Sequence, residues 1–451
     1  MAEVSFICKR TVGSTNPVQP GQFSPLSILD RVMEHNHLHV VFYYSLQTRR
    51  RAGELTKKLR ESISDMLSAF PVVTGRLLRT SEGDWTIKCN DAGVRMVEAR
   101  VEGTVDEWLN NVDREKELKL VHWEDMFHRP YFWSTFYVQI TEFECGGLAV
   151  GLSCAHLLSD PTCAAMMIKS WADVTLHGEI IAPPLFHPLP SPRTGKKNRN
   201  FHLINHYKSA KENSVPASNT KQTTITLKFN QEMVKSCIAM ATATNAHNCQ
   251  LSLTPFEALA ALFWTRISKV KGTKSALVGM SLCLDVRKVL GLEKGFFGNC
   301  MVYNRVQGDG IQETDLSKAA GFIKEAVSKT DRDEVMDLIE WLEQENWKTN
   351  PSCMNGSCLI CANLENVDSY SAVFEENSSP LRVSYYIEPS VGAGQILILP
   401  APRGDGPCSR VVSVTLPEVE AEKLLEDGLI KQFGPTIWMG LNRNLSQMEC
   451  S

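Results

Sequence analysis

The stretch Gly151-Leu-Ser-Cys-Ala-His-Leu-Leu-Ser-Asp160 decides how the middle of this chain folds. The apolar, alternating run from Gly147 to Cys154 is typical of a buried β-strand. Asp160 stands directly before a proline, which suits the first position of a helix because its missing N–H costs nothing there. We therefore predict a strand, a short turn, and a helix over Pro161 to His177 that Asp160 caps.

The turn of this stretch carries His156, which the predicted strand delivers into the interior of the fold. Histidine takes up and releases a proton near neutral pH, so an imidazole held at a strand end suits a general base. Two residue types at one spacing are weak evidence, so these residues alone favour a buried structural histidine followed by an ordinary helix cap. Both interpretations stay open on these residues alone.

Composition describes a globular protein with room for a large core. The chain has 451 residues, 43% of them hydrophobic, and a net charge of −4, so we expect two or three packed units and no nucleic-acid partner. We find no apolar run of about 18–20 residues, the length that spans a membrane, and no basic leader followed by an apolar core. We expect a cytoplasmic protein without a transmembrane segment.

Three groups of residues are candidates for metal or phosphate binding. The fourteen cysteines are irregularly spaced, which favours reduced thiols, and the pair Cys358 and Cys361 fits small buried residues on a strand better than a zinc site. His35, His37 and His39 alternate, but no carboxylate partner is evident, so we predict no metal. A cluster of lysines fits phosphate contacts and a solvated helix end equally well; its members are Lys269, Lys271 and Lys274.

Strands and helices alternate without a fixed repeat, which indicates a mixed α/β (α+β) fold. We predict an N-terminal domain over 1–181, a proline-rich and then basic crossover linker over 182–215, and a C-terminal domain over 216–451. Thr254-Pro-Phe-Glu257 is a capping box that begins a core helix in the second half. A cleft or tunnel between two such halves is the expected place for a ligand.

With these elements in order, the chain resembles the plant BAHD acyltransferases from end to end. The matching stretches are Leu26-Ser-Ile-Leu-Asp30, Phe70-Pro71 with Gly75-Arg-Leu77, His156 to Asp160, Phe256-Glu257 with Trp264, Asp285-Val-Arg287 and Phe296-Phe-Gly-Asn299. The resemblance implies two chloramphenicol-acetyltransferase-like domains, each a mixed sheet with flanking helices, and a tunnel at their interface. It also implies that His156 is the base and that Asp160 pairs with Arg287.

The second signature of that family, Asp-Phe-Gly-Trp-Gly, is missing where Phe374 to Pro380 stands. Two glycines and a tryptophan support a tight backbone path, whereas this chain places two glutamates there. Closer likeness to the Eceriferum/Glossy branch accounts for the loss, through stretches such as Ile87 to Glu98 and Ser409-Arg-Val-Val-Ser-Val414. Members of that branch are tied to cuticular wax, and their own histidine is dispensable.

Two functions follow from the resemblance. As an enzyme, the chain transfers an acyl group from acyl-CoA to a hydroxyl or amine of a small-molecule acceptor, with His156 as general base and no permanently bound cofactor. As an accessory protein, it binds a membrane-bound elongase condensing enzyme at the cytosolic face of the endoplasmic reticulum and promotes elongation to very-long-chain fatty acids. We expect a monomer in either case, and we lean towards the enzyme.

Overall fold

The structure is a computed structural model that describes residues 3–16, 18–19, 21–46, 53–81, 83–125, 128–191, 201–212, 221–242, 252–272, 277–308, 315–345, 358–390 and 392–440. The chain divides into two compact units. Unit 1 contains Met1–Ser191, Leu292–Cys300 and Asp368–Pro389, and unit 2 contains Pro192–Gly291, Met301–Val367 and Ser390–Ser451. Two late segments of the chain therefore belong to the unit that carries His156.

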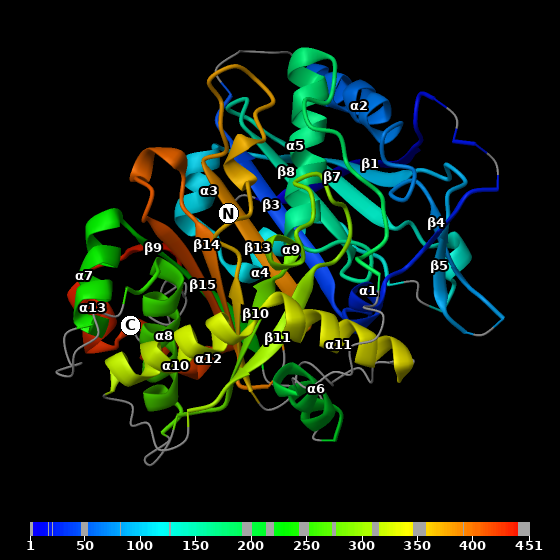
Figure 1. Cartoon of the computed structure of the whole chain (residues 1–451). Helices are drawn as coiled ribbons and strands as arrows, with labels where there is room; N and C mark the ends of the chain where they lie inside the picture. The colour runs from blue at the N-terminus through cyan, green and yellow to red at the C-terminus, as the bar shows by residue number, and fades with distance from the viewer. Residues whose placement is uncertain are drawn as a thin grey trace. The chain divides into compact units, whose positions relative to one another are not determined.

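Unit 1 is built on a six-stranded sheet in the order β1-β6-β7-β8-β3-β13 and a small sheet in the order β2-β5-β4 (Figure 1). The pair β6 and β7 is parallel, and the other neighbours in both sheets are antiparallel. The strands are β1 (Val4–Val12), β2 (Phe23–Pro25), β3 (His37–Tyr44), β4 (Arg76–Arg79), β5 (Trp85–Lys88), β6 (Val94–Val101), β7 (Phe136–Phe143), β8 (Leu148–Ala155) and β13 (Arg382–Glu388). The helical elements are α1 (Ile28–Val32), α2 (Glu54–Leu67), α3 (Val105–Asn111), α4 (Arg114–Glu117), η1 (Leu118–Leu120), η2 (Pro130–Phe132), α5 (Pro161–His177) and η3 (Ser369–Ser371).

The two faces of the six-stranded sheet differ in chemistry because side chains alternate along each strand. One face is apolar, and its central register joins Val138, Leu152, Val40 and Tyr385. The opposite face is polar, and its register joins Tyr137, Ser153, His39 and Tyr386. Helices α2 and α5 pack against each other, where the Trp171 indole N–H donates to the Leu59 carbonyl at 3.0 Å (Figure 1).

A glycine in β8 lets another segment approach the polar face closely. A Cβ atom at Gly151 would lie 2.0 Å from the carbonyl oxygen of Leu120, which belongs to η1. Such a distance is far below van der Waals contact, so no other residue fits here without moving η1. The segment with α3, α4 and η1 contacts the polar face through β7 and β8.

Unit 2 is built on a seven-stranded mixed sheet in the order β11-β10-β12-β14-β15-β9-β16. The strands are β9 (Gln222–Phe229), β10 (Met280–Asp285), β11 (Met301–Val306), β12 (Leu359–Asn363), β14 (Gln395–Pro400), β15 (Arg410–Pro417) and β16 (Thr436–Met439). The helical elements are α6 (His202–Glu212), α7 (Gln231–Thr242), α8 (Pro255–Val270), α9 (Arg287–Leu290), α10 (Leu316–Lys329), α11 (Arg332–Gln344), η4 (Arg403–Asp405), α12 (Glu418–Leu425) and α13 (Gly428–Phe433).

Helix α8 is the central helix of unit 2, and it packs against α7, α10 and α12 and on strands β12 and β14 (Figure 1). The predicted capping box is confirmed, since the Glu257 N–H donates to the Thr254 hydroxyl and the Glu257 carboxylate accepts from the Thr254 N–H. Burial along α8 is nearly complete from Phe256 to Ser268. The mixed α/β class is thus confirmed in both units.

The predicted domain boundaries stay a prediction. Each of the two observed units combines three separate segments of the sequence. Within the predicted linker over 182–215, α6 occupies His202–Glu212, while 192–200 and 213–220 lie outside the described residues. Leu185 forms an isolated parallel bridge with Phe296 inside unit 1. The beginning of the predicted linker is therefore bonded to unit 1.

Candidate active site

His156 lies immediately after β8, as the sequence predicts. Its N–H donates to the Asn36 carbonyl at 2.8 Å, which ties the residue to the loop before β3. The next residues form a tight turn, closed by the Leu158 N–H donating to the Ala155 carbonyl at 3.0 Å. The His156 side chain is buried, with 2% of the residue exposed.

Asp160 caps α5 as predicted, and Pro161 is the first residue of that helix. One carboxylate oxygen accepts from the Cys163 N–H at 3.0 Å. The other accepts from the Cys300 N–H, also at 3.0 Å. Asp160 therefore joins the start of α5 to the late segment Leu292–Cys300, a second role that the sequence analysis missed.

Asn299 is the residue that contacts the imidazole directly. Its amide oxygen lies 3.0 Å from Nδ1 of His156, and its amide nitrogen donates to the His156 carbonyl at 2.7 Å. Asn299 is completely buried. The sequence analysis placed this residue only within a stretch shared with a family. The signal in the sequence that could have singled out Asn299 is that it is the lone polar residue after the apolar and glycine-containing run from Gly295 to Gly298.

Electrostatics keep His156 neutral. Burial lowers the pKa of the imidazole because a charged ring would lose its hydration, and the nearby Asp160 carboxylate offsets part of that effect. Among the described residues, the ring makes a side-chain hydrogen bond only through Nδ1. In the neutral ring, Nε2 is therefore the nitrogen that can accept a proton, as a general base requires.

Arg287 lies at the start of α9 in unit 2, where its guanidinium pairs with Asp285 at 2.8 Å. The Asp285 carboxylate also accepts from the Arg287 N–H at 2.8 Å. The sequence Asp285-Val-Arg287 thus forms a local ion pair that orients the arginine. The expected pairing of Asp160 with Arg287 and the expected tunnel would join the two units, and both stay predictions.

The segment Phe374 to Pro380 belongs to unit 1 and leads into β13. Phe374 is buried and packs edge-on against Tyr44 and Trp171, with ring centroids 5.4 and 5.1 Å away. Asn377 has a left-handed backbone, with φ of 61°, a conformation that asparagine tolerates better than most residues. A turn without the glycines is thus accommodated, and Glu376 is exposed at its surface.

The histidines and the cysteine considered as metal ligands lie among packed or buried side chains. His37 and His39 share the polar sheet face and both pack against Trp123, with centroids 4.7 and 5.8 Å away. Cys361 lies buried in β12, where burial raises the pKa of its thiol and opposes the thiolate that a metal would need. In the described part of the chain, no three His, Cys, Asp or Glu side chains are placed to hold a metal ion.

The candidate phosphate-binding lysines lie at the end of α8 beside acidic partners. Lys269 is 3.7 Å from Asp427, and Lys271 pairs with Glu420. These ion pairs fit a helix end neutralised by neighbouring carboxylates. Lys274 lies outside the described residues.

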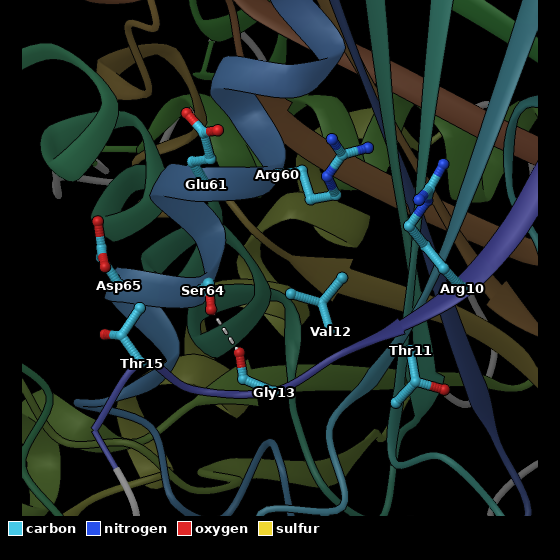
Figure 2. Close-up of a pocket in the computed structure, with 9 residues that line it drawn as sticks. All are labelled: Arg10, Thr11, Val12, Gly13, Thr15, Arg60, Glu61, Ser64 and Asp65. Atoms are coloured by element: carbon cyan, nitrogen blue, oxygen red, sulfur yellow. Dashed lines mark hydrogen bonds between the residues drawn. The ribbon is translucent and has the colours of Figure 1, made fainter.

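A hollow of about 610 Å³ lies between β1 and α2, within unit 1 (Figure 2). Its lining residues are Arg10, Thr11, Val12, Gly13, Thr15, Arg60, Glu61, Ser64 and Asp65. Arg10 and Arg60 share the Glu98 carboxylate at 2.9 and 3.1 Å, so their charge is partly neutralised. Ser64 points towards the chain at Gly13 and donates to its carbonyl at 2.7 Å (Figure 2). These bonds fasten α2 to the sheet edge, and the hollow offers no nucleophile activated by a base.

Comparison with known proteins identifies the family. The model of the Transferase family matches residues 2–428. The chain belongs to this family, the BAHD acyltransferases. Among curated members, the Arabidopsis thaliana protein ECERIFERUM 26-like is 27% identical to this chain over 429 residues, which cover 92% of each protein. This relative agrees with the Eceriferum branch indicated by the sequence.

Solved structures of BAHD-like acyltransferases share the fold. Vinorine synthase has a TM-score of 0.72 at 18% identity, and the match covers 97% of this chain and 100% of that one. TRI101 of F. sporotrichioides, in complex with coenzyme A and T-2, has a TM-score of 0.73 at 15% identity, and the match covers 92% of this chain and 99% of that one.

None of the helices in the described ranges is long and apolar enough to cross a membrane.

Proposed function

We propose that this BAHD family member transfers an acyl group from acyl-CoA to a hydroxyl or amine acceptor, with His156 as general base. The observation that carries the proposal is the buried, neutral imidazole at the end of β8, bonded through Nδ1 to Asn299. Family membership supports the reaction class. The coenzyme A bound to TRI101, which shares the fold, supports acyl-CoA as the donor.

The reaction requires one proton transfer in each direction. Nε2 of His156 takes the acceptor proton while the acceptor oxygen or nitrogen attacks the thioester carbonyl carbon. The tetrahedral oxyanion then collapses, the carbon–sulfur bond breaks, and the imidazolium returns the proton to the departing thiolate. Ester or amide and free coenzyme A are the products, and no covalent acyl-enzyme forms. In this scheme Asp160 is a positioning residue, and its pairing with Arg287 is part of the proposal.

Replacing the base tests the enzyme proposal. We expect His156→Ala to lower the rate of coenzyme A release by about 10²–10⁴-fold, the usual contribution of a general base. The assay follows free thiol from a panel of acyl-CoA donors with hydroxyl and amine acceptors. His206→Gln is the control, because His206 is a half-buried histidine whose pKa is also lowered by burial, to about 4. An unchanged rate in His156→Ala would refute the proposal.

A second function is favoured by a specific observation. The Phe374 to Pro380 segment replaces a family signature, and ECERIFERUM 26-like aligns over most of the chain. On this alternative the protein works at the cytosolic face of the endoplasmic reticulum with an elongase condensing enzyme, and His156 serves only the fold. Co-expression with such an enzyme in yeast, followed by analysis of acyl chain length, tests it. Longer chains with both wild type and His156→Ala support the accessory role, and unaltered lengths refute it.

A further inference from the structure

Asp30 is a buried carboxylate in α1 with donors on both oxygens. Only 7% of the residue is exposed. Oδ2 accepts from the Ser27 N–H at 2.7 Å as part of a capping box. Oδ1 accepts from both the backbone N–H and the side-chain amide of Asn299, at 3.0 and 2.9 Å. Burial raises the pKa of the Asp30 carboxyl, and the hydrogen bonds from Ser27 and Asn299 offset part of that rise. Three N–H donors aimed at two oxygens match the ionised carboxylate, which only accepts.

These bonds determine which way the Asn299 amide points. Its nitrogen donates to Asp30 Oδ1 and to the His156 carbonyl, at 2.9 and 2.7 Å. Neither a carboxylate nor a carbonyl oxygen can donate in return. If the amide rotated by half a turn, its oxygen would face two acceptors at these short distances. The amide oxygen is therefore held towards Nδ1 of His156, 3.0 Å away.

The orientation of the amide selects the tautomer of the imidazole. An amide oxygen accepts hydrogen bonds but cannot donate one, so Nδ1 must carry the hydrogen of this 3.0 Å contact. A neutral imidazole has only one N–H, so Nε2 is then the nitrogen with the free lone pair. The alternative tautomer would put two lone pairs against each other in a buried site.

We propose that Asp30 is a positioning residue for His156: through Asn299 it holds the imidazole in the tautomer that presents Nε2 as the base. The same chain of bonds stabilises the imidazolium that forms when the acceptor proton is taken, because Nδ1–H then donates a stronger bond to an amide polarised by a carboxylate. The effect on rate rests on the proposed function, whereas the tautomer itself does not.

The test uses Asp30→Asn, which keeps the shape of the side chain but adds a donor. In one orientation the new amide sets its NH₂ against the two Asn299 donors, and in the other against the Ser27 N–H. Heteronuclear NMR of the full chain with isotope-labelled histidine reads the protonated ring nitrogen directly, and the spectrum of His156→Gln assigns His156 among the eleven histidines. We expect Nδ1–H in the wild type and a shift of the population towards Nε2–H in Asp30→Asn.

Asp427→Asn is the matched control. Asp427 is also 7% exposed, and its carboxylate caps α13 in unit 2 by accepting from the Leu429 and Ile430 N–H groups. The Asp427→Asn variant should leave the His156 tautomer unchanged. Asn299→Ala provides a second variant should Asp30→Asn fail to fold, and it is expected to release the tautomer in the same way. Adding Asp30→Asn to Asn299→Ala should then change the tautomer no further.

Kinetics give a separate readout. We expect Asp30→Asn to lower kcat by about 10²-fold with little change in KM, because the wrong tautomer impairs proton transfer rather than binding. A wild-type ring protonated at Nε2, or an unchanged tautomer in both Asp30→Asn and Asn299→Ala, would overturn the inference. Loss of the expected tautomer without loss of rate would refute the general-base function and leave the positioning role of Asp30 standing.

Discussion

Unit 1 contains two buried polar centres that differ in how completely their groups are paired. At the first, His156 bonds to Asn299 through Nδ1, and in the described residues its other ring nitrogen makes no hydrogen bond. At the second, Glu117 is completely buried and bonds to the hydroxyls of Tyr43, Ser384 and Tyr386. The partners of each centre come from segments far apart in the chain.

The charge of Glu117 is neutralised by Arg382, whose guanidinium lies 3.4 Å from the carboxylate. Trp108 extends the centre by donating to the Tyr43 hydroxyl at 3.1 Å. A buried charge with this many partners is typical of a device that holds strands in place. Burial alone therefore does not distinguish the two centres. They differ in pairing, because the described residues give the second ring nitrogen of His156 no hydrogen bond, whereas both carboxylate oxygens of Glu117 are bonded.

The largest expected effect on stability comes from opening the Glu117 centre. Glu117→Gln leaves the Arg382 guanidinium buried without its counter-charge, and breaking such a pair costs about 3–5 kcal/mol. Urea unfolding measures the loss, with Glu232→Gln on the exposed surface of α7 as control. The variant that still folds should keep its rate of acyl transfer per molecule. A specific loss of rate would show that the two centres are not separate in function.

Acid should destabilise the fold partly through the two histidines of the polar face, His37 and His39. Burial lowers the pKa of His37 to about 4 and that of His39 to about 3. Because the unfolded chain binds these protons at a pKa of about 6.5, stability is full above pH 6.5 and is lost as pH falls towards 4. By pH 5 each histidine accounts for a loss of about 2 kcal/mol.

Urea unfolding at pH 7.5, 6 and 5 measures this dependence, with His37→Gln/His39→Gln as the variant. We expect the double variant to lose less stability than the wild type over this range. His156 and His206 retain their lowered pKa and supply the remaining slope. An identical slope in both proteins would contradict the assigned pKa directions for His37 and His39.

The smallest effect is expected at Asp160. Asp160→Ala removes the cap of α5 and the acceptor of the Cys300 N–H, a loss of about 1–3 kcal/mol. Asp331→Ala is the matched control, since Asp331 caps α11 through the Glu334 N–H and, within the described part of the chain, bonds to no second segment. Thermal unfolding should separate the two variants. Equal losses would show that the bond to Cys300 adds nothing to stability.

Sequence reasoning predicted the elements whose signals are local. The helix over Pro161 to His177 has these bounds in the structure, because Asp160 and the proline mark its start. The helix after Thr254 begins at its capping box for the same reason. The strand predicted from Gly147 to Cys154 agrees with β8 to within one residue at each end, since its apolar alternation marks it.

The partners of His156 were not predicted, because they come from other parts of the chain. Asp30 and Asn299 are 269 positions apart, and neither has a local pattern that names the other. The short strands β2, β4 and β5 were likewise missed as a separate sheet, because strands of three or four residues give too few alternating positions to read.

Local order in the residues thus accounts for the strand, turn and helix around His156, since hydrogen bonds and steric preferences between neighbours suffice to form them. Long-range packing accounts for the chemistry of the centre: it buries the imidazole, brings Asn299 to Nδ1 and sets Asp30 behind it. A pKa and a tautomer depend on desolvation and on donors a few ångströms away. Those neighbours exist only once distant segments have packed together.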